Sequence, residues 1–129
     1  MAKVRVTKAL GVGIGLRMKW EKLVDIQEEN LWRGTVFRFP AVYPFESVVD
    51  FLLFFDPHSE SGFSLICSTG YKCGHHEGSL PVEARASGNV KAISRSWLIE
   101  NWKKWVYPDT ALSEILVSSG YPQEIGENA

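Results

Sequence analysis

All three histidines and both cysteines lie between positions 58 and 76. Cys67, Cys73, His75 and His76, with His58 nearby, supply the sulfur and nitrogen ligands that Zn²⁺ prefers. Structural zinc sites usually present two short ligand pairs, whereas five residues separate these cysteines and the histidines are adjacent. Adjacent side chains of a strand point to opposite faces, so both histidines could bind one ion only from a loop. We therefore predict no metal and no cofactor, and whether Cys67 pairs with Cys73 stays open.

Other residue types with catalytic potential do not converge in the sequence. Cys73 with a histidine base at position 75 or 76 would need an orienting acid and an oxyanion-binding loop, and neither pattern is visible. The carboxylates at Glu28–Glu29, and Asp56 with Glu60, stand in polar surroundings typical of solvated surface and not of a glycosidase pair. We predict that the protein is not an enzyme and acts by binding.

Composition limits the class of partner. The 129 residues include 14 basic and 15 acidic side chains, for a net charge of −1. That balance argues against general nucleic-acid binding, which needs a basic face. No apolar run approaches the roughly 18 residues that cross a bilayer, so we expect no membrane partner. Residues 1–16 faintly resemble a signal peptide, but the apolar part is short and glycine-rich, and Arg17 and Lys19 follow it; we expect a cytoplasmic protein.

The elements that must position these groups include one tryptophan-rich helix. Three of the five tryptophans lie within nine residues, and the helical period places one apolar set on a single arc: Trp97, Leu98, Trp102, Trp105 and Val106. Ser94 or Ser96 can cap the start, and Pro108 ends the helix. Asn101 falls in the same arc and needs a hydrogen-bond partner, because burying an unpaired amide costs about 1–3 kcal/mol.

Runs of branched and aromatic residues predict strands at 36–40, 48–55 and 63–67, with a short strand around 79–82. Residues 48–55 have the length of a strand buried on both faces, and a helix opened by Pro44 is the alternative. The apolar residues of 17–32 match one face of a helix only in part, and a pair of strands is the alternative structure for this segment. We also predict a short N-terminal strand at 4–6, a glycine-rich turn at 11–15 and a second helix within 109–119, with Leu112, Ile115 and Leu116 inward.

Successive strands with short loops imply an antiparallel sheet. The predicted fold class is α+β, a single domain with an antiparallel β-sheet and the Trp-rich helix packed on one face. We place the body of the domain at 31–121. Residues 1–30 form an N-terminal strand or helix segment of the same domain, and 122–129 form a polar C-terminal tail.

The order of several motifs adds a family resemblance that covers about two thirds of the chain. The motifs are RGTVFRFP at 33–40, YPFE at 43–46, VDFLLF at 49–54, GYK at 70–72, LPVEA at 80–84, and the segment 93–108 that contains the tryptophan helix. Together they resemble a family of bacterial immunity proteins, the forty-fifth in the numbered series from polymorphic toxin systems. The tryptophan segment is the most specific of these motifs.

The resemblance implies a small α+β antidote that binds the toxic domain of a cognate, secreted or contact-delivered toxin inside the producing or sibling cell. It carries over no catalytic residue. Because many such toxins have basic substrate clefts, acidic side chains would speed association and fill the cleft. The candidate toxin-binding residues are Glu28, Glu29, Asp56, Glu60 and Glu77. The alternative is a non-enzymatic interaction module of a bacterial or phage system. The toxin's identity and the oligomeric state stay open.

Overall fold

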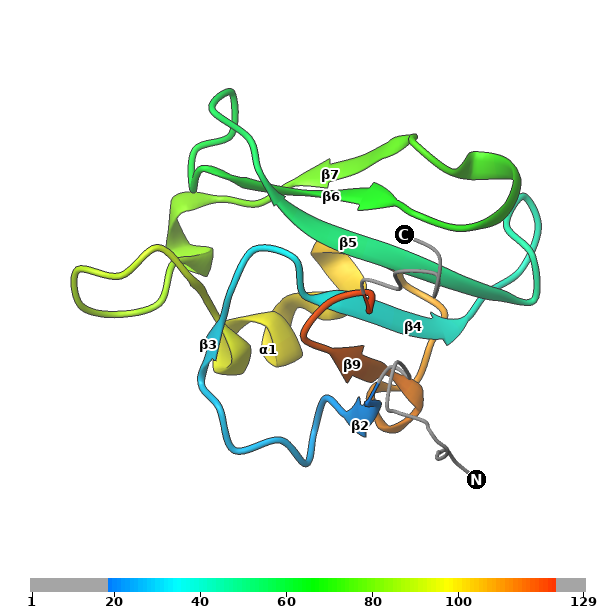
Figure 1. Ribbon diagram of the computed structural model, residues 1–129, viewed down its shortest axis with the longest axis horizontal. Helices are drawn as coiled ribbons and strands as arrows, with labels where there is room; N and C mark the ends of the chain where they lie inside the picture. The colour runs from blue at the N-terminus through cyan, green and yellow to red at the C-terminus, as the bar shows by residue number, and fades with distance from the viewer. Residues whose placement is uncertain (1–18, 123–129) are drawn as a thin grey trace, which may run out of the picture.

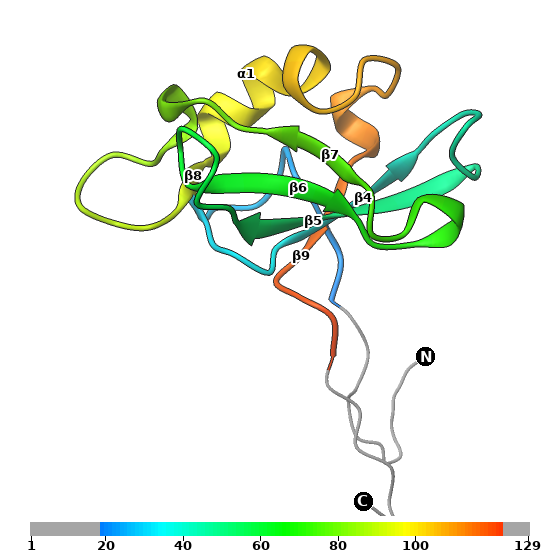
Figure 2. The same ribbon diagram turned by 90° about the horizontal axis from the view of Figure 1, so that it is seen from above.

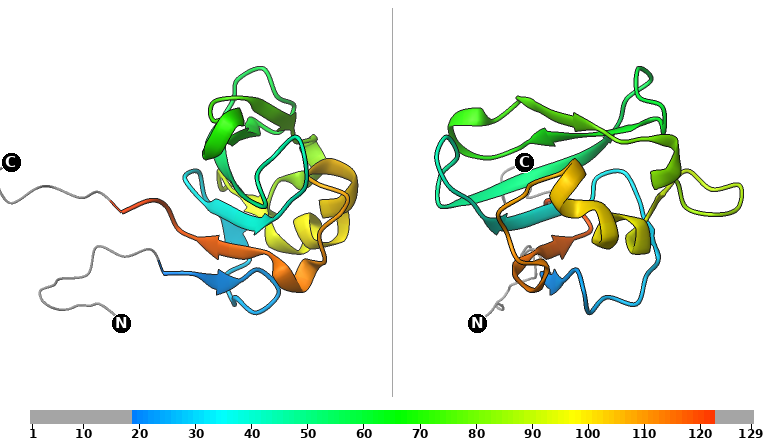
Figure 3. Two further views of the ribbon diagram at one scale, coloured as in Figure 1. Left: turned by 90° about the vertical axis from the view of Figure 1, so that its right-hand side faces the viewer. Right: turned by 180° about the vertical axis from the view of Figure 1, so that it is seen from behind.

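The computed structural model describes residues 19–122, which form one α+β domain. Within this range, a single α-helix, α1 (Arg95–Trp105), covers one face of an antiparallel sheet (Figures 1 and 2). In these residues the sheet has six strands in the order β2 (Glu21–Lys22), β9 (Leu116–Ser118), β4 (Val36–Pro40), β5 (Val48–Phe55), β6 (Phe63–Cys67) and β7 (His76–Ser79). Two further views show α1 on one side of the sheet only (Figure 3). The predicted fold class is confirmed. The predicted strand at 4–6, the turn at 11–15 and the tail beyond 122 lie outside the described residues.

Three predicted strands occur at the predicted positions: β4 (Val36–Pro40), β5 (Val48–Phe55) and β6 (Phe63–Cys67). The other strands are shorter: β2 (Glu21–Lys22), β7 (His76–Ser79) and β9 (Leu116–Ser118) in the same sheet, and β3 (Asn30–Leu31) with β8 (Ile93–Ser94) as a separate pair. Three 3₁₀ turns complete the described elements: Gly70–Lys72, Val82–Ala84 and Leu112–Glu114.

The period of two along β5 divides the sheet into a closed face and an open face. Val49, Phe51 and Leu53 are buried under α1, whereas Leu52 and Phe54, on the open face, are only half-buried. The strand prediction for 48–55 is therefore confirmed, but the expectation of burial on both faces is wrong, because no helix of residues 19–122 covers the open face (Figure 2).

Helix α1 spans Arg95–Trp105 and begins as predicted. The hydroxyl of Ser94 accepts a hydrogen bond from the backbone N–H of Trp97 at 3.1 Å, which satisfies one orphan donor of the first turn. Trp102 is fully buried, while Trp97 and Trp105 are half-buried. The Asn101 amide finds its partner within the helix, donating to the Trp97 carbonyl at 2.8 Å.

Three element predictions are wrong. Residues 109–119 contain a 3₁₀ turn and strand β9, not a helix, because β9 pairs with both β4 and β2 and so completes the sheet. Residues 19–32 hold two short strands that belong to different sheets, and neither the helix nor a mutual strand pair forms. The strand expected around 79–82 ends at Ser79, because Pro81 has no backbone N–H to donate and a 3₁₀ turn follows.

Candidate functional site

The five acidic residues predicted to bind a partner lie on three separate parts of the molecule. Glu28 and Glu29 precede β3, Asp56 and Glu60 lie in the β5–β6 turn, and Glu77 lies in β7. Glu28, Glu29 and Glu60 are exposed, whereas Asp56 is buried and Glu77 is half-buried. The fold therefore does not gather them into one acidic patch.

Glu29 is bound to the start of α1. Its carboxylate accepts hydrogen bonds from the Ser94 hydroxyl at 2.6 Å, the Ser96 hydroxyl at 2.8 Å and the Ser96 backbone N–H at 3.2 Å. The Ser94 hydroxyl is the largest cause that lowers the pKa of Glu29 below its ordinary value of 4.5, and Ser96 adds to it. An anion at a helix N-terminus is also favoured by the helix dipole. Glu29 therefore fastens the segment before β3 to α1.

The Glu29 contacts make stability depend on pH. Because the pKa of Glu29 is lower in the folded protein, its ionised form stabilises the fold above pH 4.5, and this contribution is lost as the pH falls below 4.5 through the folded value. We expect Glu29→Gln to show a smaller loss of melting temperature between neutral pH and pH 3 than the wild type. Glu28→Gln, on the adjacent exposed residue, is the control. Identical acid profiles for Glu29→Gln and wild type would contradict this assignment.

Asp56 and Glu77 are also engaged within the protein. Asp56 accepts hydrogen bonds from the Ser64 hydroxyl at 2.6 Å and the His58 backbone N–H at 3.0 Å, and these two donors lower its pKa. The Glu77 carboxylate lies 3.0 Å from Nδ1 of His75. Both carboxylates thus connect neighbouring strands and turns.

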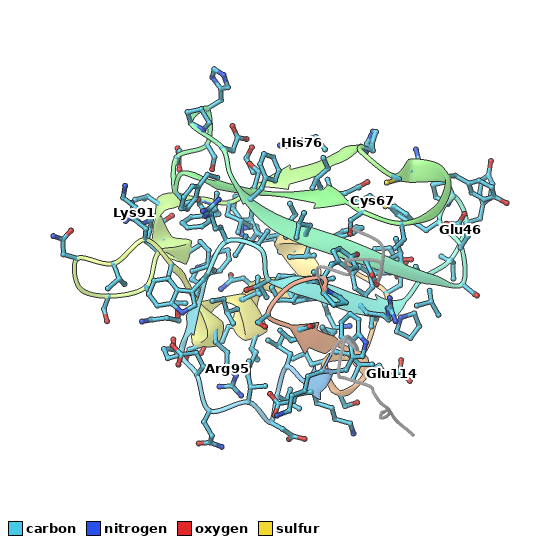
Figure 4. All side chains as sticks on the ribbon, in the orientation of Figure 1. Glu46, Cys67, His76, Lys91, Arg95 and Glu114 are labelled. Atoms are coloured by element: carbon cyan, nitrogen blue, oxygen red, sulfur yellow. The ribbon has the colours of Figure 1, made fainter. Side chains whose placement is uncertain are left out.

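The cysteines and histidines do not form a metal centre in the described part of the chain. Among residues 19–122, no three side chains of His, Cys, Asp or Glu come close enough to hold an ion. Both cysteines are free thiols, Cys67 buried and Cys73 exposed. Burial raises the pKa of the Cys67 thiol, which keeps it protonated and a poor nucleophile. His76 lies on β7 (Figure 4), with Nε2 3.6 Å from the Asp56 carboxylate.

The sequence reasoning missed a buried ion pair on the open face of the sheet. Asp50 is 1% exposed and lies opposite Arg38 in the β4–β5 register. The guanidinium binds both carboxylate oxygens, at 2.7 and 3.0 Å, and stacks on the Trp20 ring 4.3 Å from its centroid. Two charged residues of opposite sign interrupting two apolar strands were the signal that could have revealed this pair.

Tyr121 completes this polar network. Its hydroxyl donates to Asp50 at 2.7 Å and lies 2.7 Å from the Ser68 hydroxyl. Desolvation is the main cause that raises the pKa of Tyr121 to about 12. A groove of about 780 Å³ lies beside it, lined in part by Leu52, Phe54 and Arg33. The polar groups here satisfy one another, so the network holds the sheet and the C-terminal segment together.

The largest exposed apolar side chains at one end of the sheet lie on two loops and at the start of a strand. Val42 and Tyr43 belong to the β4–β5 connection, Val48 is the first residue of β5, and Tyr71 belongs to the 3₁₀ turn after β6. Tyr43 is 92% exposed and Tyr71 is 83% exposed. Figure 4 places Glu46, also in the β4–β5 connection, at the end of the sheet where Cys67 closes β6. We call Val42, Tyr43, Val48 and Tyr71 the tyrosine end.

The fold and these contacts define a small single-domain α+β protein in which several carboxylates bind groups of the domain itself and aromatic side chains are exposed to solvent. The chain belongs to the Immunity protein 45 family, whose family model matches residues 23–117. Membership supports an immunity-type function and fits a protein that is not an enzyme. Comparison with curated proteins and with solved structures gave no match. No helix of residues 19–122 is long and apolar enough to cross a bilayer.

Proposed function

We propose that this protein binds the toxic domain of a cognate contact-delivered bacterial toxin and neutralises it in the cytoplasm of the producing cell. The observation that carries the proposal is the family match over residues 23–117. The matched range begins at Leu23, which is fully buried in the core, and ends at Val117 in β9. The match thus extends from β3 into β9 and includes α1 and every strand of the six-stranded sheet except β2, so it is not confined to a short motif.

The chemistry of the described residues supports a mechanism by binding. Glu29, Asp50, Asp56 and Glu77 each have a hydrogen-bonding or ionic partner inside the domain. Such carboxylates stabilise a rigid surface, and a rigid surface loses little conformational freedom when it meets a partner. Neutralisation then requires only that the bound antidote covers the toxin's active site or a surface the toxin needs.

Co-expression tests the proposal. The toxic domain encoded by the neighbouring gene is expressed in a host with and without this protein, and growth and co-purification are measured. We expect growth to be restored and the two chains to elute together. A neighbour that binds without being toxic would indicate an interaction module of another kind, and a toxic neighbour that neither binds nor is neutralised would refute the proposal.

We further propose that acidic side chains accelerate the encounter with a basic toxin cleft. Of the five candidates, Glu28 and Glu60 suit this role best. Both are exposed, and Glu28 accepts a local hydrogen bond from the Asn30 backbone N–H at 3.2 Å, whereas changes at Glu29, Asp56 or Glu77 remove contacts with other side chains. We expect Glu28→Lys and Glu60→Lys to lower the association rate constant several-fold at low salt, with little effect at high salt, since screening weakens steering.

Stopped-flow or biosensor kinetics at two salt concentrations measure this effect. The melting temperatures of Glu28→Lys and Glu60→Lys should stay at the wild-type value, and Glu100→Lys on the exposed side of α1 is a charge-matched control. Equal association rates for wild type and both variants at low salt would remove Glu28 and Glu60 from the binding mechanism.

A further inference from the structure

We propose that the tyrosine end is the surface that contacts the toxin domain, and that Glu46 is the positioning residue that holds its two loops together. The inference rests on the proposed function, because the partner it names is the neutralised toxin. It goes further by assigning the contact to Val42, Tyr43, Val48 and Tyr71.

The same loop packs one aromatic ring, that of half-buried Phe45, against the core and leaves another exposed to solvent. Phe45 packs against Phe51, with ring centroids 5.7 Å apart, and against Tyr107 at 6.0 Å. Tyr43, two residues earlier, is 92% exposed. Large aromatic side chains contribute most to binding when a partner desolvates them, and tyrosine is enriched among residues that dominate interfaces. Tyr43 and Tyr71 therefore leave apolar surface exposed at one end of the sheet, where a bound partner can bury it.

Hydrogen bonds hold the β4–β5 connection in one conformation. The Val42 backbone N–H donates to the Tyr107 hydroxyl at 3.0 Å, which ties the loop to the segment after α1. The Ala41 N–H donates to the Ser47 carbonyl at 3.0 Å, and the Phe45 N–H donates to the Val42 carbonyl at 2.9 Å. A loop that is already ordered loses less entropy on association, so its side chains contribute more of their contact energy to affinity.

Glu46 joins the two loops. Its Oε2 accepts a hydrogen bond from the Tyr71 backbone N–H at 3.0 Å. The carboxylate lies directly over the Cα of Gly70, where a Cβ would overlap it, and Gly70 has φ of +71°, a conformation that favours glycine. This contact sets the position of Tyr71 relative to Tyr43.

The chemistry of the tyrosine end favours a protein as the partner. Tyr43 and Tyr71 each combine an apolar ring with a hydroxyl, and Val42 and Val48 add aliphatic surface. Lys72 is the neighbouring cation, while the Glu46 carboxylate is engaged with Tyr71. Nucleic acid would require a row of basic side chains around the rings. The complementary toxin surface is an apolar hollow with hydrogen-bond acceptors for the two hydroxyls and a carboxylate facing Lys72.

Alanine substitution with a matched control tests the contact. The dissociation constant for the toxic domain of the neighbouring gene and the melting temperature are measured for Tyr43→Ala, Tyr71→Ala and the double variant. Val48→Ala is paired with Val82→Ala, because the two valines are 50% and 55% exposed and Val82 lies in another turn. We expect each tyrosine change to weaken binding about tenfold or more, since interface tyrosines are often hot spots, with no change in melting temperature. Val82→Ala should bind like wild type.

Glu46→Ala and Glu46→Gln test the positioning role. Glutamine keeps an acceptor for the Tyr71 N–H, whereas alanine removes it. We therefore expect Glu46→Ala to weaken binding several-fold and Glu46→Gln to restore near wild-type affinity, at equal melting temperatures. Equal affinity of Glu46→Ala and wild type would overturn the role of Glu46.

The possible outcomes distinguish failure of the proposed contact surface from failure of the proposed immunity function. If the wild type binds the toxic domain and the double tyrosine variant binds equally well, the tyrosine end is not the contact, while the immunity function stands. If the wild type itself neither binds nor restores growth, both proposals fail. If the double variant binds weakly and also fails to restore growth, the surface and the function are supported together.

Discussion

Replacement of Trp102 by alanine is expected to lower the free energy of unfolding by about 3–5 kcal/mol. The side chain is fully buried and packs edge-on against two phenylalanines of β4, with ring centroids 5.6 Å from Phe37 and 5.2 Å from Phe39. Alanine would leave a cavity between α1 and the centre of the sheet, and the rigid strands cannot collapse to fill it. Chemical denaturation monitored by circular dichroism measures the change.

Two other substitutions make this prediction specific. Trp97→Ala should cost less, because that ring is only half-buried and faces Trp105 at the edge of the core. Trp102→Phe should also cost less than Trp102→Ala, because it keeps an aromatic ring, and Nε1 of Trp102 has no hydrogen-bond partner in residues 19–122 to lose. If purified Trp102→Ala kept the wild-type melting temperature and lost the partner instead, α1 would present this face to the toxin and not to the core.

Arg38→Met is expected to destabilise the protein by about 3 kcal/mol, the second largest effect. Removing one partner of a buried ion pair leaves the other charge uncompensated, which costs about 3–5 kcal/mol in buried sites. Asp50 is 1% exposed and would keep only the Tyr121 hydroxyl as a side-chain donor among the described residues. Because the Arg38 side chain is 37% exposed, we place the effect at the lower end of that range. Methionine preserves the aliphatic stem but removes the guanidinium that stacks on the Trp20 ring.

A double-mutant cycle tests whether the charge is the cause. Asp50→Leu in the Arg38→Met background should recover most of the lost stability, since an apolar pair of similar volume often replaces a buried ion pair without loss. Urea unfolding of the four proteins gives the interaction energy. Additive losses in the double variant would show that loss of the guanidinium contact with Trp20, and not the buried charge, accounts for the effect.

The sequence was most informative where a regular pattern coincided with strong local preference. Strands β4, β5 and β6 have the predicted bounds, because branched and aromatic residues favour extended backbone and turn residues flank the runs. The start of α1 was predicted equally well, because Ser94 is a favourable N-cap residue and precedes an apolar stripe of period 3.6. For β9 the local pattern was too short to decide, and its three residues are strand because β2 and β4 flank them in the sheet.

The candidate site shows the same division between what the local sequence predicts and what tertiary contacts decide. The sequence identified Glu28, Glu29, Asp56, Glu60 and Glu77 as acidic, and the structure distinguishes them by their partners. Glu29 binds the hydroxyl of Ser94, 65 residues along the chain, and Asp56 binds the hydroxyl of Ser64 across the β5–β6 turn. A contact between distant residues depends on topology, and a side chain's charge does not reveal it. The toxin-binding role of all five acids stays a prediction.

By itself, the sequence determined the α+β class, the three long strands, the capped tryptophan helix and the resemblance to immunity proteins, because each depends on local periodicity or motif order. Only the tertiary structure decided that Arg38 faces Asp50 across two strands, that Phe45 packs against the core while Tyr43 is exposed, and that Glu46 reaches Tyr71. These facts depend on strand register and loop packing, which place residues of distant sequence position side by side. The surface that we propose for toxin binding arises from that placement.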